Sequence, residues 1–184
     1  MQHTLEARKK DGSLVTLTLQ VLTAENIDEI LNLQNEVINL IEDKQIYLAS
    51  TRDDLLHHFK NGSVILGYVT PSQELISLVI YLKEGYNDSN YGYDIGIEGE
   101  SLLNIGQIDT VLVKPDYRGN NLQYIMCHLI EDIARETNTS MLCATASPFN
   151  PFSVNNFLKL GYEIKADKLK YGGLRRYVLA KSLK

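Results

Sequence analysis

Apolar and β-branched runs separated by turn signals predict strands in the first two thirds of the chain. Residues 4–10 and 13–21 flank an Asp-Gly turn signal, and "LVTLTLQVL" is rich in β-branched residues, so these segments predict a hairpin or a lone first strand. The runs "SVILGYV" and "LISLVIYL" lie on either side of "TPSQE", and "IGQIDTVLV" follows at 105–113. The first two runs predict strands of an antiparallel meander, and the third run predicts a further strand.

Apolar residues at helical spacing predict three helices before residue 140. The first begins after Thr23, its predicted N-cap, and carries apolar residues from Ile27 to Ile41, and the second covers 52–60. The third follows the strand at 105–113 and has one apolar face. The residues of that face are Leu122, Ile125, Met126, Leu129, Ile130 and Ile133.

The stretch 83–104 has no such periodicity and is acidic and rich in Gly, Asn and Tyr. It predicts an extended hairpin or a loop beside the strand at 105–113, and long loops are commonly functional or mobile. The chain has no internal repeat and no Pro-rich linker. Its 184 residues and 44% hydrophobic content therefore predict one domain covering 1–184.

Charge and cysteine usage exclude several classes of partner. The formal net charge is −5, and the basic clusters do not exceed Arg8-Lys9-Lys10 and Arg175-Arg176, so nucleic acid is not expected as the main partner. No apolar run reaches the length of a membrane span, so no membrane is expected either. Both cysteines lie in apolar runs, and the start of the chain has no apolar signal core, which predicts a reduced, cytoplasmic setting.

The segment "RGNN" at 118–121 lies at the predicted start of the third helix, where unpaired backbone N–H groups and the helix dipole favour an anion. Gly119 allows a ligand to approach the backbone, and Asn120 and Asn121 tolerate positive φ. The segment therefore suits a pyrophosphate, although an ordinary strand-to-helix turn would have the same composition. A P-loop and a dinucleotide-binding glycine fingerprint are both absent from the sequence.

A second segment, "MLCATASPFNPFSVNNFLKLGYEI" at 141–164, predicts a buried strand, a loop ending at Asn150, a short helix from Pro151 and a further strand. With this segment the sequence resembles the GCN5-related N-acetyltransferase (GNAT) superfamily. "VLVKPDYRG" and the helix after it resemble the family's acetyl-coenzyme A segment, [Q/R]-x-x-G-x-[G/A]. "NPFSVNNFLKLGY" resembles its later segment, N-x-x-S-x-x-x-[Y/F]-x-x-x-G-[F/Y].

The resemblance covers roughly residues 12–182 and implies an α/β (mixed α+β) fold. Its central twisted mixed sheet has an antiparallel meander followed by parallel strands and is flanked by helices. The implied activity moves an acetyl group from acetyl-CoA to a primary amine by direct attack in a ternary complex, without a metal. The implied coenzyme-binding residues are Val111, Leu112 and Val113 through their backbone, then Arg118, Gly119, Asn120, Asn121, Leu122 and Gln123, and finally Asn150, which is also a predicted helix N-cap.

The chain departs from the family pattern at three positions. Asn121 and Gln123 replace residues that are usually Gly, and Gly or Ala, which implies reshaped coenzyme contact. Phe157 replaces the tyrosine that in many relatives protonates the departing thiolate. Asp109 is the candidate general base because it shares a strand face with Val111 and Val113, with a solvated or turn-bonding carboxylate as the alternative.

Tyr124 and Tyr117 could replace the missing acid, or they could simply contribute to packing. The histidines have no carboxylate or Cys at ligand spacing, so no metal is expected. The expected acceptor is a small-molecule or peptide amine of unknown identity, and a homodimer is left open. Acidic residues near the expected acceptor side would attract a cationic amine, or they are solvated loop charges. They are Glu84, Asp88, Asp94, Glu98 and Glu100.

Two alternative functions of other classes are left open by the sequence. A catalytically weak CoA-binding or regulatory module is favoured by Phe157 and Gln123. A structural partner domain would have kept the fold alone, since a fold does not by itself determine a function.

Overall fold

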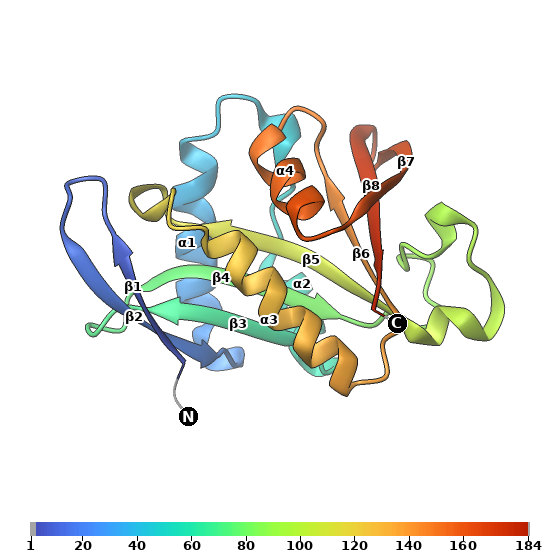
Figure 1. Cartoon of the computed structure of the whole chain (residues 1–184), viewed down its shortest axis with the longest axis horizontal. Helices are drawn as coiled ribbons and strands as arrows, with labels where there is room; N and C mark the ends of the chain where they lie inside the picture. Colours follow the sequence, from blue (N-terminus) through green and yellow to red (C-terminus); the bar gives the residue numbers. More distant parts are fainter. Residues whose placement is uncertain (1–2, 184) are drawn as a thin grey trace. The chain divides into compact units, whose positions relative to one another are not determined.

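The computed structural model describes residues 3–183, and in this range the chain forms eight strands and four α-helices (Figure 1). The strands are β1 Thr4–Arg8, β2 Leu14–Val21, β3 Val64–Val69, β4 Leu75–Leu82, β5 Ile105–Val113, β6 Met141–Ala146, β7 Glu163–Lys170 and β8 Leu174–Ser182. The helices are α1 Ile27–Asn39, α2 Arg52–Lys60, α3 Leu122–Glu136 and α4 Pro151–Lys159. Short 3-10 turns are η1 Ala24–Asn26, η2 Lys44–Ile46, η3 Tyr93–Ile95, η4 Gly99–Asn104 and η5 Pro115–Tyr117.

The strands form one mixed sheet in the order β1-β2-β3-β4-β5-β6-β8-β7. The pairs β1–β2, β2–β3, β6–β8 and β7–β8 are antiparallel, whereas β5 and β6 are parallel. A parallel pair needs a crossover connection, which α3 supplies between β5 and β6. The predicted α/β class, with a mixed sheet flanked by helices, is confirmed.

The predicted periodic segments form the expected elements, with small differences at their ends. The N-terminal segments form a hairpin, and the first helix ends at Asn39 although its apolar pattern continues to Ile41. The stretch 83–104 is a loop with two short 3-10 turns, so the extended-hairpin alternative is wrong. The buried Asn90 side chain fixes this loop, because its amide donates to the carbonyls of Gly85 and Leu102.

The described residues group into two compact units. Unit 1 contains the residues up to Glu42, Ala49–Ile80 and Thr110–Met126. Unit 2 contains Asp43–Leu48, Tyr81–Asp109 and the residues from Cys127 onward. The strands β4 and β5 and the helix α3 each continue from one unit into the other, and the expectation of a single domain over 1–184 stays a prediction.

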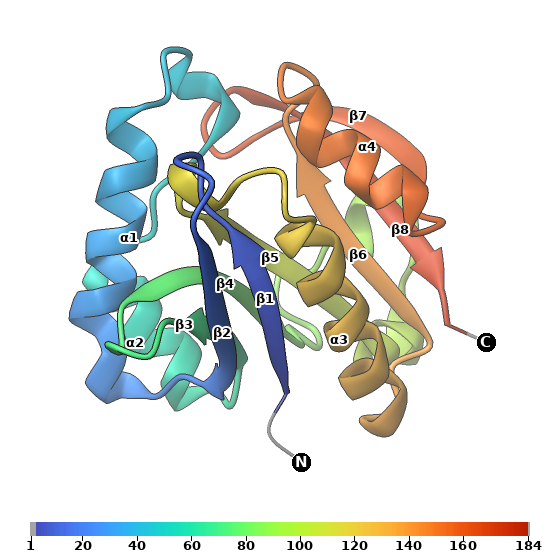
Figure 2. The same ribbon diagram turned by 60° about the vertical axis from the view of Figure 1, so that its left-hand side comes forward.

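In unit 1, α1 and α2 lie side by side, next to β3 and the first part of β4 (Figures 1 and 2). Helix α1 follows η1, whose N-cap Thr23 forms a capping box with Asn26. Its apolar residues recur at helical spacing and are buried, so the sequence pattern directly determines which face enters the core. The buried apolar residues of α1 are Ile27, Ile30, Leu33 and Val37.

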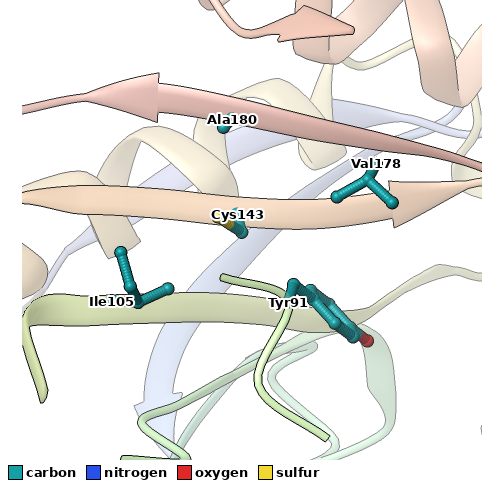
Figure 3. Close-up of a cluster of buried hydrophobic side chains, with 5 residues drawn as sticks. All are labelled: Tyr91, Ile105, Cys143, Val178 and Ala180. Carbon is teal, nitrogen blue, oxygen red and sulfur yellow. The ribbon is translucent and has the colours of Figure 1, made fainter. Parts of the chain in front are cut away.

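In unit 2, a buried cluster joins the loop before β5 to three strands (Figure 3). It consists of Tyr91, Ile105 of β5, Cys143 of β6, and Val178 and Ala180 of β8. Figure 3 shows the ring of Tyr91 beside β5, with its hydroxyl oxygen pointing away from Ile105. The tyrosine therefore has an apolar ring in the core and a polar end at the border of the cluster. No helix within residues 3–183 has the length and apolar character required to cross a bilayer.

Candidate functional site

The candidate anion site lies in unit 1, where β5 turns through η5 into α3. Gly119 has φ 92° and Asn121 has φ 57°, so the chain adopts two left-handed residues before the helix begins at Leu122. The positive φ expected of Asn121 is confirmed, whereas Asn120 does not adopt one. A Cβ built on Gly119 would meet no protein atom within 4 Å, so the glycine is required by its backbone conformation and faces open space.

The start of α3 has the properties of an anion-binding helix terminus. The carbonyl of Asn121 accepts the first bond of the helix, from the amide of Ile125 at 3.0 Å. Amides of the first turn lack an acceptor inside the helix, and the dipole makes this end positive. The Arg118 side chain is exposed and has no ion-pair partner in the described part of the chain, so it can reach an anion beside the loop.

The side chain of Asn120 makes hydrogen bonds within unit 1, a structural role that the sequence did not predict. Its Nδ2 donates to the carbonyls of Arg8 and Tyr117, each at 2.8 Å, and its Oδ1 accepts from the Arg8 amide at 2.8 Å. The Lys10 amide also donates to the Asp116 carbonyl at 3.0 Å. The Asn120 side chain therefore clamps the candidate anion loop to the β1–β2 hairpin.

We expect Asn120→Asp to lower the free energy of unfolding by about 1–2 kcal/mol, because two hydrogen bonds are lost and a negative charge then faces two carbonyl oxygens. Urea denaturation measures this change. Asn155→Asp, on the exposed side of α4, is the matched control and should change stability little. Equal stability of the two variants would show that the clamp contributes nothing.

The last residues of β5 alternate in burial as the sequence predicted. Asp109, Val111 and Val113 are half-buried, whereas Leu112 is 3% exposed. The side chain of Leu112 therefore belongs to the core of unit 1. Any contact of these residues with a coenzyme would come from their backbone, as the resemblance implies.

In unit 2, the pairing of β5 with β6 ends within both strands. The parallel register runs from Ile105↔Met141 to Ile108↔Ala144, although β6 continues to pair with β8 as far as Ala146. Asp109 and Thr145 are therefore the first residues after the last paired positions, one on each strand.

A chain of hydroxyl groups connects these two residues. The Tyr91 hydroxyl donates to Asp109 Oδ1 at 3.4 Å, and it lies 2.7 Å from the hydroxyl of Tyr171, in the turn between β7 and β8. The Tyr171 hydroxyl in turn lies 3.0 Å from Thr145 Oγ1. The Tyr91 amide donates to the buried Gln107 side chain at 2.5 Å. This bond fixes the position of Tyr91, the residue whose hydroxyl contacts Asp109.

Burial raises the pKa of Tyr91 well above its usual range, and the neighbouring Asp109 and Tyr171 raise it further. Burial also raises the pKa of Tyr171, partly offset by its hydrogen bonds to Thr145 and Tyr91. Both hydroxyls therefore stay protonated at neutral pH and act as hydrogen-bond donors.

Two cations adjoin the tyrosines. Lys170 Nζ lies 5.0 Å from the centre of the Tyr91 ring and forms an ion pair with Asp94. The Arg176 guanidinium lies 5.8 Å from the Tyr171 ring and donates to the Gln45 carbonyl at 2.7 Å, and burial lowers its pKa. Because Lys170 and Lys168 both pair with Asp94, this carboxylate is not one of the loop charges available to attract a cationic acceptor.

The later sequence segment forms β6 and α4 as predicted. Asn150 is the N-cap of α4, and its side chain accepts from the Ser153 amide at 3.3 Å, so the capping role is confirmed. Phe157 is 3% exposed and packs edge-to-face against Tyr162, with ring centres 5.2 Å apart. The position of the family tyrosine is therefore filled by a core phenyl ring.

The other candidate acids differ in exposure. Tyr124 lies in the first turn of α3 and is 38% exposed, whereas Tyr117 is buried and burial raises its pKa. Tyr124 thus remains the more accessible candidate. Leu122 is buried at the start of α3, and Gln123 follows it in the same turn.

No group of three or more His, Cys, Asp or Glu residues that could hold a metal occurs within residues 3–183. Cys127 and Cys143 are free and buried, and burial raises the pKa of Cys143 to about 12. Neither thiol is therefore a reactive thiolate near neutral pH.

Sequence reasoning identified Asp109 and the loop at 118–121, but it missed Tyr91, Tyr171 and Thr145. The only local signal was "KYGG" at 170–173, which indicates a turn and places a tyrosine in it. Tyr171, Gly172 and Gly173 all have positive φ, at 53°, 78° and 117°. The contact of this turn with Asp109 and Tyr91 depends on the tertiary structure.

The comparison with solved structures identifies the fold of the chain. No protein-family model matches the sequence, and no curated protein sequence matches it significantly. Among solved structures, an N-acetyltransferase from Staphylococcus aureus Mu50 matches with a TM-score of 0.66 and 14% identity, over 91% of this chain and 99% of that one. An acetyltransferase of the GNAT family from Streptococcus pneumoniae matches with a TM-score of 0.67 and 13% identity, over 90% and 98% of the two chains.

A GNAT superfamily phosphinothricin acetyltransferase from Sinorhizobium meliloti, in complex with acetyl-CoA, matches with a TM-score of 0.66 and 12% identity. That match covers 90% of this chain and 88% of the other. All three likenesses extend over nearly the whole of both chains. This chain therefore has the GNAT fold.

Proposed function

We propose that the chain is a member of the GNAT superfamily and an acetyl-CoA-dependent N-acetyltransferase that acts on a primary amine. The observation that carries this proposal is the end of the β5–β6 pairing at Ile108↔Ala144, with the carboxylate of Asp109 as the next residue. Unpaired strand backbone at such a point can bind an extended ligand by main-chain hydrogen bonds, and a carboxylate beside it can take a proton. The acetyltransferase structures with the same fold support this reading.

The residues of unit 1 fit the diphosphate part of coenzyme A. The first turn of α3, the left-handed residues Gly119 and Asn121, and the exposed Arg118 would hold its negative charges. Open space beside Gly119 leaves room for this group. The backbone of Val111, Leu112 and Val113 would bind the pantetheine arm and donate to the thioester oxygen.

The reaction requires a neutral amine to attack the thioester carbon, a group that accepts its proton, and a leaving sulfur. Asp109 is the proposed general base. A thiol has a pKa of about 8.5, so the thiolate leaves readily and needs little help from an acid. The phenyl ring of Phe157 is therefore compatible with turnover, with solvent or Tyr124 as the proton source.

The second candidate function is a CoA-binding module with little catalysis. It is favoured by the replacement of the usual tyrosine with the buried Phe157. Release of free CoA in the presence of a panel of primary amines separates the two functions. Sustained thiol release with at least one amine supports the enzyme, and coenzyme binding without any release supports the module.

We expect millimolar acetyl-CoA to raise the Tm of the protein, because a ligand that binds only the folded state stabilises it by mass action. Gly119→Val should remove most of this shift, since a β-branched residue is strained at φ 92° and would distort the loop. Thermal denaturation with and without acetyl-CoA measures both effects.

Gly62→Val is the matched control, because Gly62 also has a positive φ of 75° and no protein atom near a built Cβ. It should lower the Tm of the free protein by a similar amount and keep the acetyl-CoA shift. A full shift in Gly119→Val would refute the role of this loop in coenzyme binding.

A further inference from the structure

We propose that Tyr91 and Tyr171 form a proton path that leads from the acceptor amine to Asp109. This inference rests on the proposed acetyltransferase function and assigns two residues to it. The path would explain how Asp109, which contacts the buried Tyr91, receives a proton from an acceptor amine that binds from solvent.

The hydrogen-bond geometry gives the path a direction. The ionised carboxylate of Asp109 can only accept, so the Tyr91 hydroxyl proton points toward it. The Tyr91 oxygen is then an acceptor for the Tyr171 hydroxyl at 2.7 Å, and the Tyr171 oxygen is an acceptor for Thr145 at 3.0 Å. Because each hydroxyl donates one bond, the hydroxyl protons of Thr145, Tyr171 and Tyr91 all point along the path toward Asp109.

Burial changes along the path in the way a relay requires. Tyr171 is 39% exposed, whereas Tyr91 is only 3% exposed. Tyr171 is therefore the end of the proposed path nearer to solvent, where the amine would approach, and Tyr91 is the inner end that would transmit the proton within the protein. The distance of 3.4 Å between Tyr91 and Asp109 is long, and such contacts commonly shorten when substrate binds.

The surrounding elements hold both hydroxyls in place. The Tyr91 amide is bonded to Gln107 of β5, and three successive positive φ values fix the turn that carries Tyr171. A tyrosine with positive φ is strained, and strain of this kind is retained most often at functional sites.

Charged groups face the path from the packed elements. Lys170 of β7 lies over both tyrosine rings, Arg176 of β8 lies over that of Tyr171, and Asp94 of η3 neutralises Lys170. Asp109 of β5 is the carboxylate in hydrogen-bond contact with a hydroxyl of the path. Because Asp94 neutralises Lys170, the Arg176 guanidinium is the cation whose charge favours loss of a proton from an ammonium group beside Tyr171.

The proton balance of the step is as follows. The acceptor ammonium gives a proton to the Tyr171 oxygen while the Tyr171 proton moves to Tyr91 and the Tyr91 proton moves to Asp109. The neutral amine then attacks the thioester carbon, the C–N bond forms, and the C–S bond breaks with its electron pair on sulfur. The second amine proton ends on the thiolate, and Asp109 releases its proton to solvent.

The test compares Tyr171→Phe and Tyr91→Phe with the wild type, using the most active amine of the panel. Both variants keep the ring and remove the hydroxyl. We expect each to lower kcat/KM about tenfold or more at pH 7, with an unchanged acetyl-CoA shift in Tm. The double variant should be no slower than either single variant, because one break interrupts the whole path.

The pH profile distinguishes a relay from a purely structural role. Above the pKa of the acceptor amine the substrate is already neutral, so the defect of both variants should disappear there. Tyr93→Phe is the control, because its hydroxyl donates to the Tyr86 carbonyl in the same loop and is not part of the proposed path. It should keep the kcat/KM of the wild type at every pH.

Three results would overturn the relay. A normal kcat/KM of Tyr171→Phe at pH 7 would refute the relay and leave the acetyltransferase function intact. A loss of kcat/KM in Tyr171→Phe that has the same size at every pH would refute the relay in the same way. Absence of CoA release from the wild-type protein with every amine would overturn the proposed function and the relay together. If Tyr91→Phe does not fold, Tyr171→Phe in its partly exposed turn decides the question alone.

Discussion

Asp109→Asn should lower kcat/KM by about 10²-fold or more, with little change in the KM for acetyl-CoA. The carboxamide has the shape of the carboxylate, and its oxygen can still accept the Tyr91 hydroxyl bond, so the site keeps its form. It cannot take up a proton, however, and the loss of a general base commonly costs this much. Steady-state thiol release over a range of pH measures the effect.

Asp132→Asn is the matched control for this substitution. Asp132 lies on the exposed side of α3 in an ion pair with Arg135, so its replacement should not affect turnover. A normal kcat/KM of Asp109→Asn at every pH would remove Asp109 from the mechanism. A loss confined to the affinity for acetyl-CoA would assign it to binding instead.

Lys181→Met should lower the free energy of unfolding by about 3 kcal/mol. Both oxygens of the buried Glu131 accept from Lys181 Nζ, at 2.8 and 2.7 Å, and removal of Lys181 takes away the nearest partner of this buried charge. The effect lies at the lower end of the usual range because Lys181 is partly exposed and Arg135 lies 3.5 Å from the same carboxylate. Urea denaturation measures the change.

The exposed pair of Lys165 with Glu163 provides the control. Lys165→Met should change stability by less than about 1 kcal/mol, since exposed ion pairs contribute little. Adding Glu131→Gln to Lys181→Met should restore part of the lost stability, because the buried charge is then removed. Equal effects of Lys181→Met and Lys165→Met would contradict the importance of the buried pair.

The secondary structure was largely predictable because it depends on local periodicity. The apolar runs of β3 and β4, the alternation along β5 and the apolar face of α3 all correspond to elements of the fold. The loop at 83–104 was not predictable in detail. Its conformation is fixed by Asn90, whose side chain bonds to carbonyls five and twelve residues away.

The candidate site was predictable only where it is contiguous in sequence. The anion loop is a short segment whose glycine and asparagines directly indicate its backbone conformation. The residues of this site are distant in sequence, because Tyr91 lies 18 residues from Asp109 and 80 residues from Tyr171. The clamp of Asn120 joins residues 112 positions apart, so no local pattern could have revealed its structural role.

This clamp places unequal constraints on its two partners as the sequence diverges. Arg8 takes part through its backbone amide and carbonyl alone, so any residue except proline can keep both bonds at that position. Asn120 contributes a carboxamide that donates and accepts at once, and among the other amino acids only glutamine has that group, on a longer stem. The N-terminal strand can therefore lose all recognisable sequence similarity among relatives and still support the loop.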